Sequence, residues 1–248
     1  MKSFLKRSIA TLAILAIGAG AASAADLKGV PSADDLVTVA PEGKPINWNT
    51  IYAGIQGHYD WDNHDLTASS TGGPVFAELN GFGGHGLGYG AIVGGDLARG
   101  NFLFGAACEY DDSDSEAKFN IGGHGGLTAT ASRGTGWDCF GRFGYLWGTG
   151  KRALLYGFAG YGQQDQTYAI SAGLDRAAVD KSTNGFVYGI GAEYAFNNFA
   201  SIDFRLKRFD GDSITVYSDQ CITLRDNPDY TTAVFGLKIK VGPGALGY

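Results

Sequence analysis

The chain contains eight segments of roughly ten residues in which apolar side chains alternate with small or polar ones. A period of two places successive side chains on opposite faces of an extended strand. The pattern therefore predicts an all-β protein. The eight predicted strands cover residues 51–61, 86–97, 102–110, 134–147, 153–163, 185–196, 199–209 and 231–241.

The gaps between these segments alternate strictly in length. Residues 98–101, 148–152 and 197–198 form short gaps, whereas the other four gaps run to 21–24 residues. Outer-membrane barrels have short turns at the periplasmic end and long loops outside. The spacing predicts an eight-stranded antiparallel up-and-down transmembrane β-barrel with four long extracellular loops and with both termini in the periplasm.

One face of nearly every predicted strand is aromatic or aliphatic, and we expect it to meet lipid. In the fifth strand the alternation is less clean, but Leu154, Tyr156 and Phe158 share a face. Aromatic side chains at the strand ends are typical of the two membrane interfaces. The predicted outer girdle is Tyr59, Trp61, Tyr110 and Trp137, and the predicted inner girdle is Tyr145, Trp147, Phe196 and Phe199.

The opposite face of the strands carries charges of both signs. An eight-stranded barrel is just wide enough for side chains to fill it, and a buried unpaired charge is expensive. We therefore expect a salt-bridged, plugged lumen. The alternative is a narrow water thread along these charges, which would make a pore for ions or small solutes. The predicted network is Asp96, Glu109, Asp138, Arg142, Glu193, Asp203, Arg205, Lys207, Lys238 and Lys240.

The N-terminus has the pattern of an export signal. Lys2, Lys6 and Arg7 precede an apolar run over 9–22, and Ala22-Ser23-Ala24 is a small-x-small cleavage site. Residues 1–24 are predicted to be a signal peptide, with a membrane anchor as the alternative. The polar segment 25–47 contains three prolines and is predicted to be a flexible periplasmic leader, and 48–248 the barrel.

Composition and charge narrow the class of function. The formal net charge of −6 becomes −9 when the three cations of the signal are removed, which argues against nucleic-acid binding. Forty glycines and 13% aromatic residues suit a closed sheet in a membrane. A soluble lipocalin-like barrel would need the opposite arrangement of polarity, with apolar side chains inside. We expect a cell-surface protein of the Gram-negative outer membrane.

Several strand motifs resemble the small outer-membrane β-barrel family of opacity-type porins. Residues 47–54 (NWNTIYAG) are similar to the first-strand motif of the branch of alphaproteobacterial surface immunogens and hemin-binding proteins. Residues 141–145 (GRFGY) and 189–196 (GIGAEYAF) resemble two further strands of that branch. The resemblance implies contact with lipopolysaccharide and with the barrel-assembly machinery. The family ends on Phe, whereas this chain ends on Tyr248 after a glycine-rich stretch.

The four histidines, His58, His64, His85 and His124, are all predicted to lie at the outer mouth. Imidazole binds metals and haem iron, and members of the resembling branch bind hemin, so a mouth site for hemin or a divalent metal is one hypothesis. The alternative is that these are solvated loop residues, because no tight metal-ligand spacing is present. No resident metal or cofactor is expected.

Three cysteines in an oxidising compartment leave one over. Cys108 and Cys139 fall on adjacent predicted strands, where a pairing of Tyr110 with Trp137 would bring them into register, so a cross-strand disulfide is conceivable. The acidic run 111–116 could hold divalent cations, but it fits a solvated loop better.

No nucleophile motif is present, and His58 with Asp60 lacks an evident serine partner, so an enzyme is not expected. The sequence thus favours a monomeric structural and surface-interaction barrel, whose long loops would bind host surface molecules or hemin.

Overall fold

The computed structural model describes residues 45–121, 127–172, 175–218 and 221–242, apart from some side chains within these ranges. The predicted signal peptide, the leader up to residue 44, His124 and the last six residues lie outside this part of the chain. The only helical element described is a single 3₁₀ turn, η1 (Thr149–Lys151). No described helix is long and apolar enough to cross a membrane.

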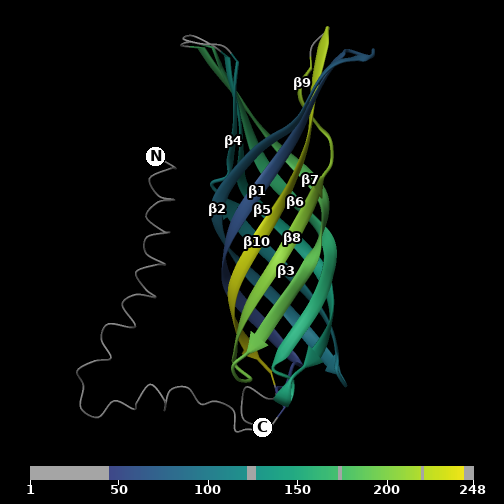
Figure 1. The fold of residues 1–248 in the computed structure, drawn as a ribbon, viewed down its shortest axis with the longest axis vertical. Coiled ribbons are helices and arrows are strands. Elements are labelled where there is room, and N and C mark those ends of the chain that lie inside the picture. Colours follow the sequence, from purple (N-terminus) through teal and green to yellow (C-terminus); the bar gives the residue numbers. More distant parts are fainter. Residues whose placement is uncertain (1–44, 122–126, 173–174, 219–220, 243–248) are drawn as a thin grey trace, which may run out of the picture. The chain divides into compact units, whose positions relative to one another are not determined.

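Ten antiparallel strands close into a ring (Figure 1). The order around the ring is β1-β10-β8-β7-β6-β5-β3-β2, and β1 pairs with both β10 and β2. The short strand β4 continues the position of β3 between β2 and β5, and β9 continues β8 against β10. The strands are β1 (Thr50–Ser70), β2 (Val75–Arg99), β3 (Phe102–Ser113), β4 (Glu116–Ile121), β5 (Leu127–Trp147), β6 (Ala153–Ala172), β7 (Asp175–Ala195), β8 (Ala200–Gly211), β9 (Ile214–Ser218) and β10 (Ile222–Val241). The predicted eight-position all-β barrel is confirmed.

Three tight connections join strands at the end of the barrel where β1 begins and β10 ends, which we call the short-turn end. Gly100 and Gly148 adopt φ values of 65° and 81° there, a left-handed conformation that glycine accepts at no steric cost. These connections match the three short gaps of the sequence.

The opposite end, the long-hairpin end, differs from the prediction. The four expected loops are largely strand, because β1, β2, β5, β6, β7 and β10 run far past the predicted boundaries. β1 stays paired with β10 as far as Ser70 and Ile222, and β6 with β7 as far as Ala172 and Asp175. Backbone hydrogen bonding needs no lipid-facing side, so the sheet continues where outward side chains become polar and the hydrophobic alternation ends.

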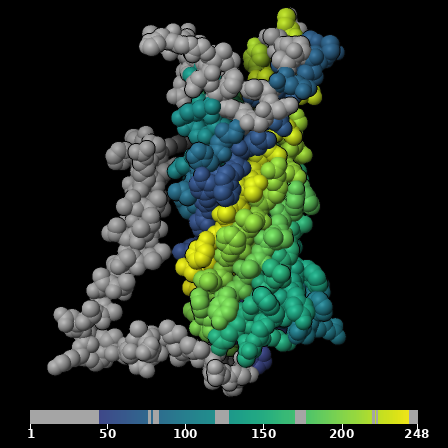
Figure 2. Space-filling model, viewed as in Figure 1, coloured from purple at the N-terminus to yellow at the C-terminus, as the bar shows by residue number. Residues whose placement is uncertain are grey.

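Side chains alternate between the lumen and the outer surface as predicted. Ile51, Ile55 and Trp61 are 48–67% exposed, while Gln56, His58 and Asp60 on the same strand are 0–5% exposed. All eight predicted girdle residues point outward, with Tyr59 half-buried. Figure 2 shows the strands packed side by side in a slanted wall.

The apolar face of β6 is the exception to the expected polarity. Leu154, Tyr156 and Phe158 share a face, and that face is the lumen, where each is at most 5% exposed. They form one buried cluster with Leu103, Phe140 and Val187. Aromatic side chains therefore fill the lumen between charged groups as well as lining the outer wall.

Candidate functional site

Within the described structure, charged and polar side chains gather in the lumen of the barrel. All ten predicted lumen charges point inward and are 0–4% exposed. Each of them takes part in at least one ion pair within the barrel. The structure brings them together in tiers that we name from the short-turn end upward.

The lower tier is centred on Arg142 and Glu193. Arg142 donates from Nε to Asp96 at 2.8 Å, pairs with the same carboxylate through its second nitrogen, and reaches Glu193 at 3.0 Å. Glu193 also accepts the ammonium groups of Lys238 at 3.0 Å and Lys240 at 2.7 Å. A forked guanidinium between two carboxylates fixes geometry as well as charge.

The middle tier is centred on Glu109. Arg205 reaches Glu109 at 2.7 Å and Asp203 at 2.9 Å, and Gln56 donates to Glu109 at 3.1 Å. Lys207 lies 2.5 Å from the opposite oxygen of Glu109 and 2.9 Å from Asp138. Lys238 contacts Asp203 at 3.2 Å and so joins this tier to the lower one.

Three carboxylates of this region could geometrically surround a metal ion. Glu109, Asp111 and Asp138 each offer an oxygen within 4.8 Å of the others. The ammonium of Lys207 contacts all three, at 2.5, 3.3 and 2.9 Å. A lysine cation thus supplies the charge that these acids need, and the group fits an internal ion pair rather than a metal centre.

An upper tier was missed by the sequence analysis. Arg133 pairs with Asp60 at 2.8 Å and Asp111 at 3.1 Å, and its guanidinium lies 3.8 Å from the centroid of the Tyr230 ring. Asp111 and Arg133 were both predicted to lie in a long loop, which is wrong. Arg133 faces inward because a register shift between Arg133 and Gly136 changes the phase of alternation in β5.

The acidic run 111–116 is likewise not a solvated loop. Asp111, Ser113 and Ser115 are 1–2% exposed, whereas Asp114 and Glu116 are exposed, because β3 and β4 continue the alternation through this segment. The run divides between the two faces of the wall, so its carboxylates do not converge on one cation site.

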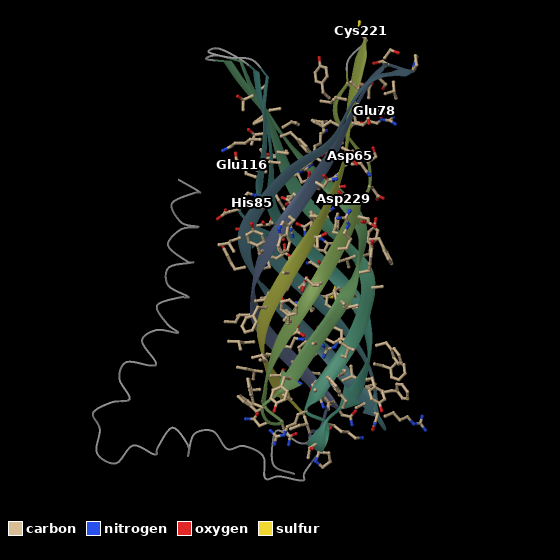
Figure 3. All side chains as sticks on the ribbon, viewed as in Figure 1. Asp65, Glu78, His85, Glu116, Cys221 and Asp229 are labelled. Atoms are coloured by element: carbon tan, nitrogen blue, oxygen red, sulfur yellow. A yellow bond between two sulfur atoms is a disulfide. The ribbon has the colours of Figure 1, made fainter. Side chains whose placement is uncertain are left out.

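The predicted histidine site does not assemble among the described residues. His58 and His64 face the interior of the barrel and are each 5% exposed. His85 lies on the outside of the wall, stacked against Tyr59 with centroids 6.1 Å apart (Figure 3). His124 lies outside the described residues. The alternation along β1 and β2 places His58 and His64 inside the barrel and His85 outside it. The described histidines therefore do not converge on one site at the mouth.

His64 instead takes part in a closure at the long-hairpin end. Its Nδ1 lies 2.7 Å from Asp226, and Tyr168 donates to the same carboxylate at 2.5 Å. Tyr168 comes from β6, while His64 and Asp226 come from β1 and β10. Burial, and then the Asp226 carboxylate, raise the pKa of Tyr168, which lies well beyond the predicted outer girdle. Val179, Ile214 and Val216 pack against the small buried cluster that Tyr168 forms with Ala117 and Ala131.

The short-turn end is closed by the residues that precede β1. Ile46 donates its backbone N–H to Gly150 at 2.8 Å and is 5% exposed. Trp48 is 1% exposed and donates from its indole nitrogen to the carbonyl of Lys151 at 2.8 Å. The last residues of the predicted leader therefore belong to the packed barrel.

The serine that the sequence analysis did not find for His58 and Asp60 is present but arranged differently. Ser113 donates to Asp60 at 2.6 Å, and His58 Nε2 lies 3.3 Å from the same carboxylate. In a nucleophilic triad the serine would donate to the imidazole. Here the carboxylate holds both groups, and all three are at most 5% exposed.

Cys108 and Cys139 form the cross-strand disulfide that the sequence left open, and it joins β3 to β5. Both side chains lie on the outer surface of the wall, Cys108 exposed and Cys139 half-buried.

A closed antiparallel ring with apolar and aromatic side chains on its outer surface and charged groups enclosed is the architecture of a transmembrane barrel of the outer membrane. The family model described as "Outer membrane protein beta-barrel domain" matches residues 9–240. The chain therefore belongs to the outer-membrane β-barrel domain family, and that family implies the cell outer membrane as its location. No curated protein sequence matches the chain.

Among solved structures, the chain is similar to Ail, the attachment invasion locus protein of Yersinia pestis, with 12% identity over 77% of this chain and 98% of that one and a TM-score of 0.38. It is similar to the outer membrane protein OprG of Pseudomonas aeruginosa, with 13% identity over 80% and 98% and a TM-score of 0.49. The outer membrane protease OmpT of Escherichia coli matches with 11% identity over 79% and 98% and a TM-score of 0.47.

Proposed function

We propose that the protein is a non-conducting, non-enzymatic barrel that anchors its long hairpins at the cell surface. The observation that carries this proposal is the complete ion pairing of the ten lumen charges within a packed interior. Ions pass a channel only if the lumen can hydrate or coordinate them. Here the carboxylates of the lumen are already paired with the protein's own ammonium and guanidinium groups, so they are not free to coordinate a passing ion.

Closure at both ends supports the same proposal. Trp48 and Ile46 fill the short-turn end, and the contact of Tyr168 with Asp226 joins strands across the long-hairpin end. A solute would therefore have to displace packed side chains at each end, as well as separate ion pairs between them. The Asp60-centred arrangement of Ser113 and His58 supports a structural rather than a catalytic role for these residues.

Planar-bilayer conductance of the refolded protein tests the proposal. The fraction of folded protein is first measured by gel mobility with and without heating, and a large water-filled porin at equal mass serves as positive control. We expect no steady current steps above the lipid background. Steady steps that scale with the folded fraction would show a conducting pore and would overturn the proposal.

In this surface role, the short-turn end would lie in the periplasm and the long-hairpin end outside the cell. The protein would be a monomer in the membrane. Support comes from the asymmetry of the connections, since outer-membrane barrels keep their short turns inside. Lipopolysaccharide and the barrel-assembly machinery are the partners expected of such a protein. An epitope inserted between Thr71 and Pro74, at the β1–β2 turn, should be detected by antibody on intact cells. Detection only after the outer membrane is opened would reverse the assignment.

The extended hairpins are the surface that this barrel would present to host molecules. The β1–β2 hairpin can be shortened by joining Thr67 to Glu78, which are paired partners, through a two-residue turn. We expect the shortened protein to keep its heat-modifiable mobility and to lose adhesion of expressing cells to immobilised host matrix. Unchanged adhesion in this variant and in one with the β6–β7 hairpin shortened would contradict a surface-interaction role for the hairpins.

A further inference from the structure

The Cys108–Cys139 disulfide lies on the lipid-facing wall of the barrel. The two residues are directly opposite each other on β3 and β5, and the neighbouring outward pair on one side is Tyr110 with Trp137. On the other side, Ala106 lies opposite Gly141. Cys108 is thus inside the apolar band of β3, between the girdle residue Tyr110 and the lipid-facing Phe104.

This position has a chemical consequence. Thiol–disulfide exchange proceeds through a thiolate that attacks a disulfide sulfur, and access of the two partners controls the rate. Hydrocarbon disfavours the thiolate and excludes a water-soluble protein catalyst. Once β3 and β5 are in the bilayer, neither formation nor reduction of this bond is available to soluble redox partners.

A disulfide between the wrong cysteines would interfere with folding, so it matters whether oxidation or folding comes first. The chain has three cysteines, and the bonded pair is separated by 31 residues. In the barrel, the backbone of Cys221 accepts a hydrogen bond from Thr71 at the long-hairpin end, at the tip labelled in Figure 3. A bond from Cys221 to either of the other two cysteines is incompatible with the β1–β10 pairing, which holds the neighbouring Ile222 opposite Ser70 at the tip.

We propose that a periplasmic thiol–disulfide oxidoreductase makes the Cys108–Cys139 bond before the barrel inserts, and that the bilayer then isolates the bond from soluble redox partners. In the first step one cysteine thiolate attacks the disulfide of the enzyme and forms a mixed disulfide. The second thiolate displaces the enzyme sulfur, so the chain loses two electrons and two protons and the enzyme becomes a dithiol. The inference rests on membrane insertion alone and holds whether or not the barrel conducts.

The test compares oxidation before and after folding. The chain carrying Cys221→Ser is reduced in urea and divided, and one half is folded into phosphatidylcholine vesicles, with folding verified by gel mobility. Both halves receive oxidised glutathione, and remaining thiols are counted with a maleimide polymer after denaturation. We expect the unfolded chain to lose both thiols and the folded chain to react about tenfold more slowly or not at all.

A matched control uses the next outward pair along the same two strands. Asp112 and Thr135 lie opposite each other, beyond Tyr110 and Trp137 and outside the apolar band. The control carries Asp112→Cys and Thr135→Cys with all three native cysteines replaced. We expect its folded and unfolded forms to oxidise at similar rates, because water reaches this pair.

Three results decide the matter. Equal oxidation rates for the natural pair and the control pair in vesicles would overturn the proposal, and so would two thiols in the Cys221→Ser protein purified from outer membranes without reductant. Failure of the reduced chain to fold, when the oxidised chain folds under the same conditions, would support it, because oxidation would then have to come first.

Discussion

The indole ring of Trp48 lies over the ammonium of Lys240, with Nζ 3.5 Å from the ring centroid. This contact joins the segment before β1 to the last strand. It places the indole ring against the charged lumen at the short-turn end. Lys240 is 0% exposed and also pairs with Glu193 at 2.7 Å. The residues that close the short-turn end, which we call the floor of the barrel, are therefore part of the ion network rather than a separate plug.

Replacing Trp48 by Ala should destabilise the barrel by about 3 kcal/mol, because a buried ring, a cation–π contact and an indole hydrogen bond are lost together. Urea unfolding followed by the fraction of the fast-migrating folded band measures the change. The matched control is Trp147→Ala, which removes a ring that is 60% exposed to the outside. Equal losses for the two variants would show that Trp48 does not close the floor.

Replacing Lys207 by Met should destabilise the barrel by about 3–5 kcal/mol, because Glu109, Asp111 and Asp138 lose a buried cation. Adding Asp138→Asn should restore part of the loss, since it removes the carboxylate that pairs with Lys207 at 2.9 Å. The same urea assay is used. Lys118→Met, which breaks an exposed pair with Glu116, should change stability by less than about 1 kcal/mol.

Gly88 sits opposite His58 across the β1–β2 ladder. A Cβ at this position would overlap the His58 imidazole and approach the carbonyl of Asp112 to 2.5 Å. Gly88→Ala should therefore cost about 1–3 kcal/mol through overpacking. Gly57→Ala is the control, because a Cβ there meets only the carbonyl of Gly88 at 3.9 Å. A neutral Gly88→Ala would mean that His58 does not occupy its observed position.

Tyr168 gives the closure at the long-hairpin end a pH dependence. Because its pKa is raised by burial and by Asp226, the folded state holds the phenol proton more tightly than the unfolded chain. The stabilisation is fully present below about pH 10, the ordinary pKa of tyrosine, and is lost as the pH rises further.

Protease resistance of the long hairpins should therefore fall above about pH 10 in the natural protein. Tyr168→Phe should lower that resistance at neutral pH and flatten the alkaline change, because the hydrogen bond to Asp226 is absent throughout. An alkaline loss of resistance that is identical in both proteins would contradict the role of Tyr168.

Period-two alternation predicted the barrel, the number of strand positions and the inward direction of every charge in the ten-residue network. These residues could be assigned because lipid on one side and enclosure on the other impose opposite polarity on neighbouring positions. Beyond Tyr110, the outward face becomes polar, so Asp111 and Ser113 lost the contrast that marks a strand. Continuing the alternation from Glu109 would have placed Asp111 in the lumen.

Arg133 could not be assigned by such an extrapolation. The register shift between Arg133 and Gly136 reverses the phase, so the residue takes the opposite face from the one its spacing to Trp137 implies. The partners of His64 were also beyond the sequence, because Asp226 and Tyr168 are 162 and 104 positions away and meet only when the ring closes. Local patterns specify faces, whereas pairings across the lumen depend on closure.

Carboxyl footprinting in membranes tests most directly whether the charges are enclosed. Asp203 and Asp210 lie on the same strand, β8, but the side chain of Asp203 is 0% exposed and that of Asp210 is 50% exposed. Folded protein in vesicles is treated with a water-soluble carbodiimide and an amine, and each site is quantified by mass spectrometry. We expect Asp210 to be modified and Asp203, with Glu193, to react only after denaturation. Modification of Asp203 and Glu193 at the rate of Asp210 in the folded barrel would contradict a filled, ion-paired lumen.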